Sequence, residues 1–401
     1  MTFDISKIIR PNILTLEPYR CARDDFQEGI LLDANENTYG PGLDRLSTTE
    51  KALNLNRYPD PHQIELKKKI CAYRNSQALK PESLIKVPSG QELTADNLCL
   101  GVGSDESIDA LIRASVKPGA EKVMLCPPTY GMYSICCVVN DVEIVQVPLN
   151  LDTFQIQPDK ILEQLRRDPA IKLVYITSPG NPTATLIKQD LLLEVLRGIE
   201  RLSWNGFLLL DEAYIDFSPI GSSMCVLVNK YKNLVVMQTF SKAFGLAGIR
   251  LGITYSTPEL SSLLNAMKYP YNVSNITSSI ALRATNLSSL KKMRATVDVI
   301  VEQRSLVLEQ ILKLKGVGRN IGGTNSNFIL IELLNRQGVA DNAVAREVYS
   351  KLATERQVVV RFRGNELGCK GCLRITIGTP EENRKLLEQF EQVLNEVYEK
   401  S

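Results

Sequence analysis

A lysine that follows an apolar run is the residue of this sequence best suited to covalent chemistry. The run Leu234–Met237 predicts a buried strand, and Thr239, Ser241 and Lys242 follow its carboxyl end, with Arg250 further on. In open α/β sheets, ligands bind at the carboxyl ends of the strands. A lysine amine withdrawn from water loses its proton more readily and can form a Schiff base with an aldehyde. The hydroxyls and the guanidinium would suit a phosphate. A plain loop with a surface lysine is the competing interpretation.

Two further strand ends carry polar side chains that could serve a flat, charged ring. Asp211 follows the apolar run Phe207–Leu210, where a carboxylate is costly to bury unless it faces a cation such as a protonated pyridine nitrogen. Tyr214 comes three residues later and could hydrogen-bond a neighbouring phenolic oxygen. Asn181, held extended before a proline, also offers an amide for hydrogen bonding. An acidic N-cap and an ordinary Asn-Pro turn are the competing interpretations.

Two other loops predict an anion site and a stacking surface. In Gly101–Glu106 a strand gives way to a helix, whose free N–H groups attract anions, and Gly103 would allow a close approach. Cys126–Tyr133 follows the next strand, and its two prolines could aim Tyr130 at a flat heteroaromatic ligand. A tight turn and a tyrosine packed on its own loop are the alternatives.

Two arginines in the last fifth of the chain predict a second anion site. Arg374 lies in the alternating strand Leu373–Ile377, and Arg361 ends the neighbouring run Val358–Arg361. Two guanidinium groups suit a carboxylate or a phosphate. An edge salt bridge is the alternative for Arg374.

The composition indicates an ordinary globular protein with room for two domains. The chain has 401 residues, 44% of them hydrophobic and 23% charged, with a net charge of +2. Without a basic tract, nothing points to nucleic acid or to an anionic membrane surface. No apolar stretch approaches the ~20 residues that a spanning helix needs. The first residues lack a hydrophobic signal segment, so we expect a cytoplasmic protein.

The numbers and spacing of the histidines and cysteines argue against hydrolase triads and metal sites. His62 is the only histidine, whereas hydrolase triads need a histidine base and most transition-metal sites use several imidazoles. The nine cysteines fit reduced, buried thiols, and the pair Cys369 and Cys372 lacks the second pair that a zinc site needs. We therefore expect no metal site, and proton transfer by groups other than histidine.

The elements that must position these residues alternate along the chain. Seven apolar runs between residues 98 and 254, several separated by helix-period segments, predict strands buried on both faces. Helices between them imply right-handed crossovers and a mostly parallel sheet. The last two runs are closely spaced, which favours an antiparallel pairing for one of them.

The pattern changes after about residue 285 to a smaller α+β arrangement. We predict a large domain over residues 61–285 and a small domain over 286–401 and 1–60, with an N-terminal arm; residues 75–95 read as a loop or insertion. The expected elements are a long helix ending at Gly316, strands at 328–331, 358–361 and 373–377, and helices at 344–352 and 381–399.

Taken together, these stretches resemble the fold-type I aminotransferases, which use pyridoxal 5′-phosphate. The resemblance spans about residues 10 to 395 and implies that family's α/β fold. Five residues occur in the family's order: Asn181, Asp211, Tyr214, Lys242 and Arg250. The longer motifs resemble the branch that acts on histidinol phosphate: Ala34-Asn-Glu-Asn37, Arg57-Tyr-Pro59, Asp211-Glu-Ala-Tyr-Ile-Asp-Phe217, Ser241-Lys-Ala-Phe-Gly-Leu-Ala-Gly248 and Cys372-Leu-Arg-Ile-Thr-Ile-Gly378. One departure is Ala184, where the family has glycine after Asn-Pro-Thr; it tests whether that turn needs a positive φ.

The resemblance implies a role for each candidate residue. Lys242, Asp211 and Tyr214 would be catalytic: Lys242 forms the Schiff base and moves a proton, and Asp211 keeps the ring nitrogen protonated. Tyr214 and Asn181 would bond the phenolic oxygen, and Tyr130 would stack on the ring. The residues implied for the cofactor phosphate are Ser104, Asp105, Thr239, Ser241, Arg250 and Tyr58 of the partner subunit. Those implied for the substrate are Tyr19, Asn35, Asn327, Arg361 and Arg374.

The activity implied is a reversible transamination by a cytoplasmic homodimer in L-histidine biosynthesis. It would interconvert L-histidinol phosphate plus 2-oxoglutarate and 3-(imidazol-4-yl)-2-oxopropyl phosphate plus L-glutamate, with no nucleic-acid or membrane partner. An aromatic amino-acid aminotransferase and a decarboxylase of phosphorylated amino acids are rivals on the same fold. A non-catalytic regulator that binds pyridoxal phosphate is a third rival. Such regulators carry a DNA-binding module, and the sequence has no basic helix-turn-helix stretch.

Overall fold

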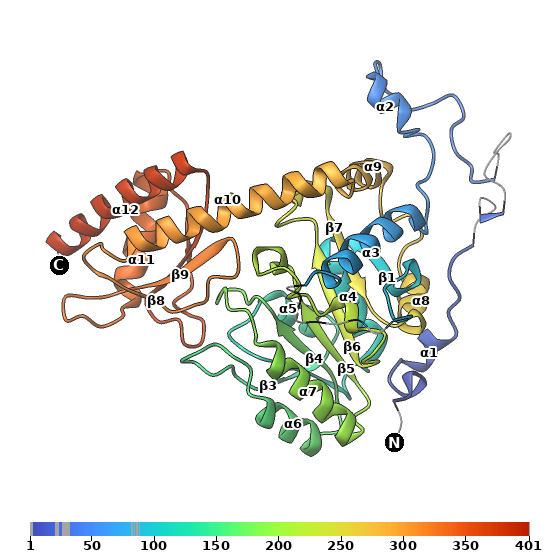
Figure 1. Cartoon of the computed structure of the whole chain (residues 1–401), viewed down its shortest axis with the longest axis horizontal. Helices are drawn as coiled ribbons and strands as arrows, with labels where there is room; N and C mark the ends of the chain where they lie inside the picture. The colour runs from blue at the N-terminus through green and yellow to red at the C-terminus, as the bar shows by residue number, and fades with distance from the viewer. Residues whose placement is uncertain are drawn as a thin grey trace.

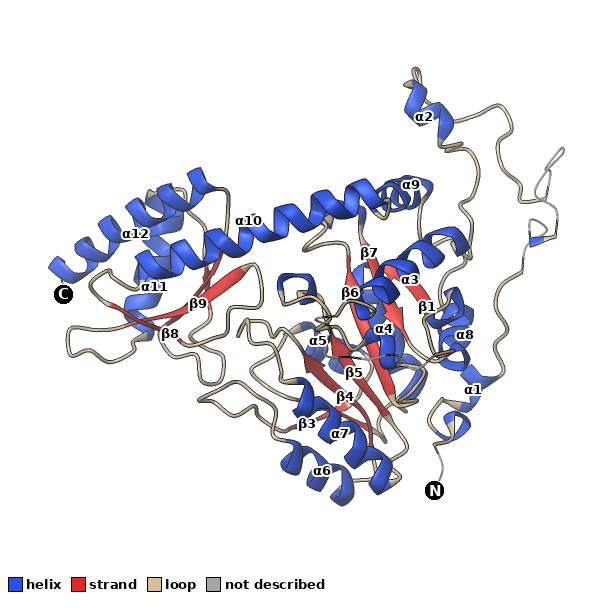
Figure 2. Cartoon of the chain, viewed as in Figure 1, coloured by secondary structure: helices blue, strands red, loops and turns tan. Residues whose placement is uncertain are grey.

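The protein is described by a computed structural model that covers residues 3–20, 24–25, 33–81, 83, 85, 87 and 89–400. Its fold is α/β, with a large sheet and a small one (Figure 1). Figure 2 shows the strands of the large sheet with helices on both sides, and the small sheet at the far end of the long helix α10 (Leu287–Ile311).

The large sheet has seven strands in the order β1-β7-β6-β5-β4-β2-β3. Only β7 is antiparallel to its neighbours, β1 and β6; the remaining pairs are parallel. The predictions of a mostly parallel sheet and of one antiparallel strand are therefore confirmed. The strands are β1 (Leu98–Val102), β2 (Lys122–Leu125), β3 (Glu143–Gln146), β4 (Ile171–Thr177), β5 (Phe207–Asp211), β6 (Leu234–Thr239) and β7 (Leu251–Tyr255).

The central strands are buried on both faces, as their uninterrupted apolar sequence predicts. Along β5, Leu208 and Leu210 enter the core on one face, while Phe207 and Leu209 enter the core on the other. The first core is completed by α3 (Ile64–Ala78), α6 (Pro158–Arg167), α7 (Gln189–Leu202) and α9 (Asn275–Ala284). The second is completed by α4 (Gly103–Ser115), α5 (Met132–Val139), α8 (Pro258–Met267) and α1 (Pro11–Leu14).

The small sheet is antiparallel throughout, in the order β10-β11-β9-β8, and has its own core. Its elements are β8 (Val317–Asn320), β9 (Phe328–Leu333), α11 (Asn342–Glu355), β10 (Arg361–Phe362), β11 (Cys372–Thr376) and α12 (Pro380–Lys400). The strand predicted over 358–361 was misplaced, because residues 358–360 have no pairing partner and β10 begins at Arg361.

The N-terminal arm leaves the body of the molecule and carries the short helix α2 (Thr48–Ala52) (Figure 1). Before the arm, Ile8, Ile9 and Ile13 pack in the second core of the large sheet. Within the segment 75–95, α3 continues to Ala78; residues 82, 84, 86 and 88 lie outside the described residues. The domain limits stay a prediction. Among the described helices, none is both long and apolar enough to cross a membrane.

Candidate active site

A cavity of about 320 Å³ lies where the carboxyl ends of β4, β5 and β6 meet the small sheet. Most of the predicted site residues line it, as expected for strand ends that share one edge of a parallel sheet. The lining consists of Ser104, Asp105, Tyr130, Thr177, Asn181, Asp211, Ala213, Tyr214, Thr239, Ser241, Lys242, Ala247, Arg250, Arg363 and Arg374.

Lys242 stands on the tight loop after β6, where the Gly245 N–H donates to its carbonyl oxygen at 2.9 Å. Its side chain opens into the cavity, and Nζ lies 5.4 Å from the centroid of the Tyr214 ring. Burial lowers the pKa of the Lys242 amine most, and the positive charge of Arg374 lowers it further. The negative charges of Asp211 and Asp105 act in the opposite direction. More of the amine is therefore unprotonated, which is the form that attacks a carbonyl.

Asp211 is the last residue of β5 and is buried. Its Oδ2 accepts the Tyr133 hydroxyl at 2.6 Å, and its Oδ1 accepts the Ala213 N–H at 3.0 Å. Burial raises the pKa of Asp211 to about 6, although both hydrogen bonds lower it. The side chain is thus mostly ionised at neutral pH, and it presents a fixed negative charge to the cavity.

One end of the cavity is built to hold an anion. The helix α4 begins there at Gly103, so that its first N–H groups, including those of Ser104 and Asp105, have no partner within the helix. Arg250 Nη2 lies 3.6 Å from Asp105 Oδ2, and Nη1 lies 3.5 Å from Ser241 Oγ. Gly103 has φ +72°, and a Cβ at this position would lie 2.3 Å from Arg250 Nη2. Glycine therefore allows the guanidinium to approach the helix start.

Tyr130 is fixed at the wall of the cavity between two neighbours. Its hydroxyl lies 3.3 Å from Asp105 Oδ1, and its ring meets the Tyr133 ring edge-on at 5.7 Å. Burial and then the Asp105 charge raise the pKa of Tyr130 to about 12, so the phenol stays neutral. A neutral, immobilised ring suits stacking on a flat ligand.

The opposite end of the cavity is formed by arginines of the small sheet. Arg374 Nη1 donates to Asn181 Oδ1 at 2.6 Å, and the guanidinium lies over the Phe328 ring at 5.2 Å. The Tyr214 ring also meets Phe328, edge-on at 5.2 Å. Burial raises the pKa of Tyr214 to about 12, against the charges of Arg374 and Arg363. This hydroxyl is therefore a neutral hydrogen-bond donor.

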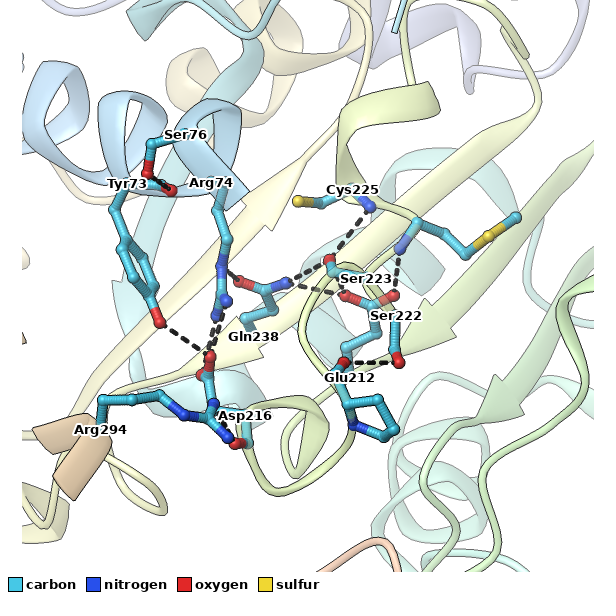
Figure 3. Close-up of polar contacts among 12 residues, drawn as sticks. Tyr73, Arg74, Ser76, Glu212, Asp216, Ser222, Ser223, Cys225, Gln238 and Arg294 are labelled. Atoms are coloured by element: carbon cyan, nitrogen blue, oxygen red, sulfur yellow. Dashed lines mark hydrogen bonds and ion pairs between the residues drawn. The ribbon is translucent and has the colours of Figure 1, made fainter. Parts of the chain in front are cut away.

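A buried network that includes Arg74, Gln238, Glu212 and Asp216 (Figure 3) holds the residues next to Asp211 and Tyr214 in the chain. Arg74 of α3 donates to both oxygens of Asp216, at 2.7 and 2.9 Å, and to Gln238 Oε1 at 2.8 Å. Gln238 Nε2 in turn donates to Glu212 Oε2 at 2.7 Å. The loop is thus held on both sides of Tyr214, at Glu212 and at Asp216.

The two carboxylates of this network sit in different environments. Burial raises the pKa of Glu212 to about 7, since its partners are the uncharged donors Ser223, Met224 N–H and Gln238. For Asp216, burial also acts to raise the pKa, but the charge and hydrogen bonds of Arg74 outweigh it and keep the pKa below its ordinary value. The Arg74–Asp216 pair therefore remains charged inside the protein.

Five predicted residues lie outside the cavity of their own chain. Tyr19 and Tyr58 are exposed on the arm and meet Tyr271, which stacks on Tyr58 at 4.5 Å and meets Tyr19 edge-on at 5.7 Å. These tyrosines line an arm cavity of about 720 Å³ with His62, and Asn35 lines another of about 420 Å³. Both are larger than the Lys242 cavity, but no lysine is among the described residues that line them.

The other two belong to the small sheet. Arg361 is exposed and lies directly opposite Arg374 in the β10–β11 ladder. The Asn327 carbonyl oxygen accepts the Ile377 N–H at 2.9 Å.

Sequence reasoning missed three residues of the site: Tyr133, Thr177 and Arg363. Tyr133 follows Tyr130 by three residues, a spacing that places both on one side of a helix start. Arg363 follows Arg361 by two residues, which in a strand places both on one face. These spacings could have identified both. Within the described ranges, no group of three or more His, Cys, Asp or Glu side chains could hold a metal ion.

Comparison with known proteins agrees with this geometry. The pattern of the family described as aminotransferase class I and II matches residues 27–390. The chain is similar to the histidinol-phosphate aminotransferase of Candida maltosa, at 58% identity over 98% of this chain and 99% of that protein. It is also similar to the histidinol-phosphate aminotransferase of Saccharomyces cerevisiae, at 53% identity over 98% of each.

Solved structures share the fold at low sequence identity. The histidinol-phosphate aminotransferase of Clostridium acetobutylicum superposes with a TM-score of 0.71 at 22% identity, covering 89% of this chain and 99% of that one. That of Sinorhizobium meliloti, solved in complex with pyridoxal 5′-phosphate, gives 0.73 at 21% identity, covering 91% and 90%.

Proposed function

Because the chain belongs to the class I and II aminotransferase family, we propose that it is a pyridoxal-phosphate-dependent transaminase of L-histidinol phosphate. It converts L-histidinol phosphate and 2-oxoglutarate to 3-(imidazol-4-yl)-2-oxopropyl phosphate and L-glutamate, reversibly, in L-histidine biosynthesis. The observation that carries the proposal is a single cavity that combines a lysine of lowered pKa, a buried carboxylate and two cationic ends. The names of the relatives, which match this chain over nearly its whole length, support the choice of substrate.

The residues present fit pyridoxal phosphate. At Gly103 a Cβ would fill the space between the helix start and Arg250, so the absent side chain keeps that anion cradle open. Ser104, Asp105, Thr239, Ser241 and Arg250 would hold the phosphate. Asp211 would face the ring nitrogen, Asn181 and Tyr214 the phenolic oxygen, and Tyr130 the ring.

Each side chain in the cavity would then have a separate chemical role. When bound, pyridoxal phosphate supplies an aldehyde that carries amino groups and a ring that draws electrons from the reacting carbon. Lys242 would attach the cofactor and move the proton of the reacting carbon, because its lowered pKa increases the share of the amine that carries no proton. Asp211 would hold a proton at the ring nitrogen. Tyr214 donates a hydrogen bond from its neutral hydroxyl.

The arginine end would bind the anionic part of each substrate. Arg374 would take the carboxylate of glutamate or 2-oxoglutarate and would also contact the phosphate of histidinol phosphate, for which Arg361 and Tyr19 of the partner subunit are the candidates that the resemblance implies. Asn35 and Asn327 complete the substrate pocket. Both substrates thus use one site in alternate half-reactions.

The proposal includes a cytoplasmic homodimer. Tyr19, Asn35 and Tyr58 lie on an arm that extends away from the cavity of its own chain, and their exposure suits entry into a neighbouring cavity. Tyr58 of the partner subunit would then complete the phosphate cradle. A closed pair of this kind uses the same surface twice.

An absorbance titration tests the function. The purified protein should acquire the absorbance of a lysine-bound pyridoxal phosphate, and histidinol phosphate added without 2-oxoglutarate should convert it to the amine form of the cofactor. The same concentration of phenylalanine should convert a much smaller share of the cofactor to the amine form. A band that forms equally in Lys242→Ala without added amine, or a spectrum that histidinol phosphate leaves unchanged, would refute the proposal.

A further inference from the structure

We propose that Arg363 is a substrate-binding residue that forms, with Arg374, a two-guanidinium site for the phosphate group of the substrate. The inference rests on the proposed function and adds to it a residue that determines specificity. It is carried by the position of Arg363, by its buried unpartnered donor and by the charge at this end of the cavity.

Arg363 reaches the cavity directly. It follows β10 and lines the same cavity wall as Arg374 of the adjacent strand β11. The two guanidinium groups are close enough that, after burial, the positive charge of Arg363 is the largest cause that lowers the pKa of Arg374. Arg361 does not line the cavity, although it lies opposite Arg374 in the ladder.

The backbone of Arg363 is held on both sides. Its N–H donates to the Cys372 carbonyl oxygen at 2.8 Å. The side chain of Asn342 then clamps the turn, because its Nδ2 donates to the Gly364 carbonyl oxygen at 3.0 Å and its Oδ1 accepts the Gly371 N–H at 2.7 Å. A guanidinium on so constrained a backbone is pre-organised for a ligand.

Both guanidinium groups have donors without acceptors. Among the described residues, six buried side-chain nitrogen or oxygen atoms have no hydrogen-bond partner, and two of the six are the Nε atoms of Arg363 and Arg374. The acceptors near the pair are the neutral Asn181 Oδ1 for Arg374 and Glu366 Oε1, at 3.4 Å, for Arg363. Buried donors of this kind require a partner, and a ligand with several oxygens provides it.

The charge at this end favours a dianion. The carboxylates that line the cavity are Asp105, at the Arg250 end, and Asp211, which faces the middle; neither is hydrogen-bonded to Arg363 or Arg374. Glu366, which does not line the cavity, forms an ion pair with Arg363 at 3.4 Å, so the two guanidinium groups and this carboxylate together keep a net positive charge. That charge and the remaining donors match a phosphate monoester, whose oxygens can engage both guanidinium groups. A carboxylate has only two oxygens and can be satisfied by Arg374 alone. Arg363 therefore matters more for histidinol phosphate than for 2-oxoglutarate.

The test is a substrate comparison on Arg363→Gln. This variant should lower kcat/KM for histidinol phosphate by about 10- to 100-fold, mainly through KM, as expected for the loss of one hydrogen bond between charged groups. The kcat/KM for phenylalanine and the KM for 2-oxoglutarate should change by less than about 3-fold. Arg363→Lys keeps the charge but not the paired donors, so its kcat/KM for histidinol phosphate should lie between the values of the wild type and of Arg363→Gln.

Two additional measurements separate binding from catalysis and from general damage. In a Lys242→Ala background, which removes turnover, Arg363→Gln should weaken equilibrium binding of histidinol phosphate by a similar factor. Arg346→Gln is the matched control, because Arg346 stacks on Phe362 at 4.2 Å, on the other side of β10, and its loss changes the net charge equally. Its kcat/KM should stay within about 2-fold of the wild-type value.

The outcomes distinguish the inference from the function on which it rests. An Arg363→Gln variant that processes histidinol phosphate as well as an active wild-type enzyme overturns the inference and leaves the function intact. An equal loss for histidinol phosphate and phenylalanine also overturns it, since Arg363 would then not select the phosphate. A wild-type enzyme inactive towards histidinol phosphate overturns both.

Discussion

Asp211 illustrates, at the scale of single residues, how opposing effects leave a usable charge in the cavity. Burial alone disfavours a carboxylate, but the Tyr133 hydroxyl and the Ala213 N–H stabilise it, and the resulting pKa is about 6. Tyr133 is itself held by Thr177, whose Oγ1 lies 2.8 Å from the phenolic oxygen. A ring cation can pair with Asp211 only when the carboxylate is ionised.

The affinity for pyridoxal phosphate should therefore weaken as the pH falls through about 6, because Asp211 becomes protonated. Tyr133→Phe removes one stabilising donor, so the pKa of Asp211 should rise and the loss of affinity should begin at a higher pH. At neutral pH the dissociation constant should increase about 10-fold. Equilibrium titrations of the cofactor-free protein across this pH range measure it. Asp211→Asn is the control that should lack this step, and an unchanged midpoint in Tyr133→Phe would refute the assignment.

The sequence predicts the strand-end residues better than the others for a physical reason. Lys242, Asp211 and Asn181 each follow a strand, and strand ends in a parallel sheet converge whatever the details of packing. Arg363 and Tyr133 depend on side-chain direction across two elements, which the sequence encodes only through spacing. The structure of a single chain cannot test the prediction for Tyr58, because that prediction puts Tyr58 in the active site of the partner subunit.

At the scale of elements, the long apolar runs predict the large sheet, whereas of the short edge strands of the small sheet β8 is missed and β10 is misplaced. β8 reads Val-Gly-Arg-Asn, with a single apolar residue, and β10 has only two residues. Such strands form because neighbouring strands offer hydrogen bonds, not because their own sequence favours them. The existence of the long helix α10 is predicted, since its buried stripe includes Met293, Val297 and Val307, but the helix ends at Ile311 and not at Gly316 as the sequence suggested.

The structure shows whether the turn at Ala184, where the family has glycine, needs a positive φ. Ala184 has φ +51°, so the turn does use the left-handed region, and its side chain is buried in an apolar cluster that includes Tyr214 and Phe328. Ala184→Gly should relieve about 1 kcal/mol of backbone strain. It should also lose a comparable amount through the buried methyl group and the more flexible unfolded chain.

The free energy of unfolding of Ala184→Gly should therefore stay within about 1 kcal/mol of the wild-type value, measured by urea titration of the cofactor-free protein. Ala281→Gly, at a buried site in α9, is the control, and it should be destabilised by about 2 kcal/mol because there is no strain to relieve. If Ala184→Gly lowered the free energy of unfolding by more than about 2 kcal/mol, the relieved strain would not offset the lost methyl group, and the prediction would be wrong.

The Arg74–Asp216 pair should act on both stability and the site. Arg74→Met leaves a buried carboxylate unpaired and should lower the free energy of unfolding by about 3 to 5 kcal/mol. Arg74→Met with Asp216→Leu removes both charges and should recover much of that loss. Cofactor affinity should remain weakened in the double variant, because the Tyr214 segment is no longer held. Urea titration and cofactor binding measure the two effects, and full recovery of affinity would contradict the positioning role.

At the scale of the whole molecule, the described residues of the arm do not line the Lys242 cavity of their own chain. Tyr19, Asn35 and Tyr58 gather beside Tyr271, while Lys242 and its neighbours form a separate cavity. A homodimer that exchanges arms would unite the two groups and place two composite sites in each pair.

Mixing two impaired variants tests this arrangement. Tyr58→Ala and Lys242→Ala should each be weakly active or inactive as homodimers. After co-refolding, random pairing should give hybrids in which one site has both wild-type residues, restoring about a quarter of the wild-type activity. Lys242→Ala mixed with Asp211→Asn is the control that should not recover, because these residues belong to one cavity. Activity no higher than the sum of the separate variants would exclude a shared site.

The central claim is that this chain transfers an amino group from L-histidinol phosphate to 2-oxoglutarate through Lys242. Glutamate formation by the purified, pyridoxal-phosphate-loaded protein tests it most directly, with histidinol phosphate and phenylalanine compared as donors. We predict a kcat/KM at least about 100-fold higher for histidinol phosphate, a difference of about 2.7 kcal/mol in transition-state binding, and no measurable turnover by Lys242→Ala. A preference for phenylalanine, or turnover that survives the loss of Lys242, would contradict the claim.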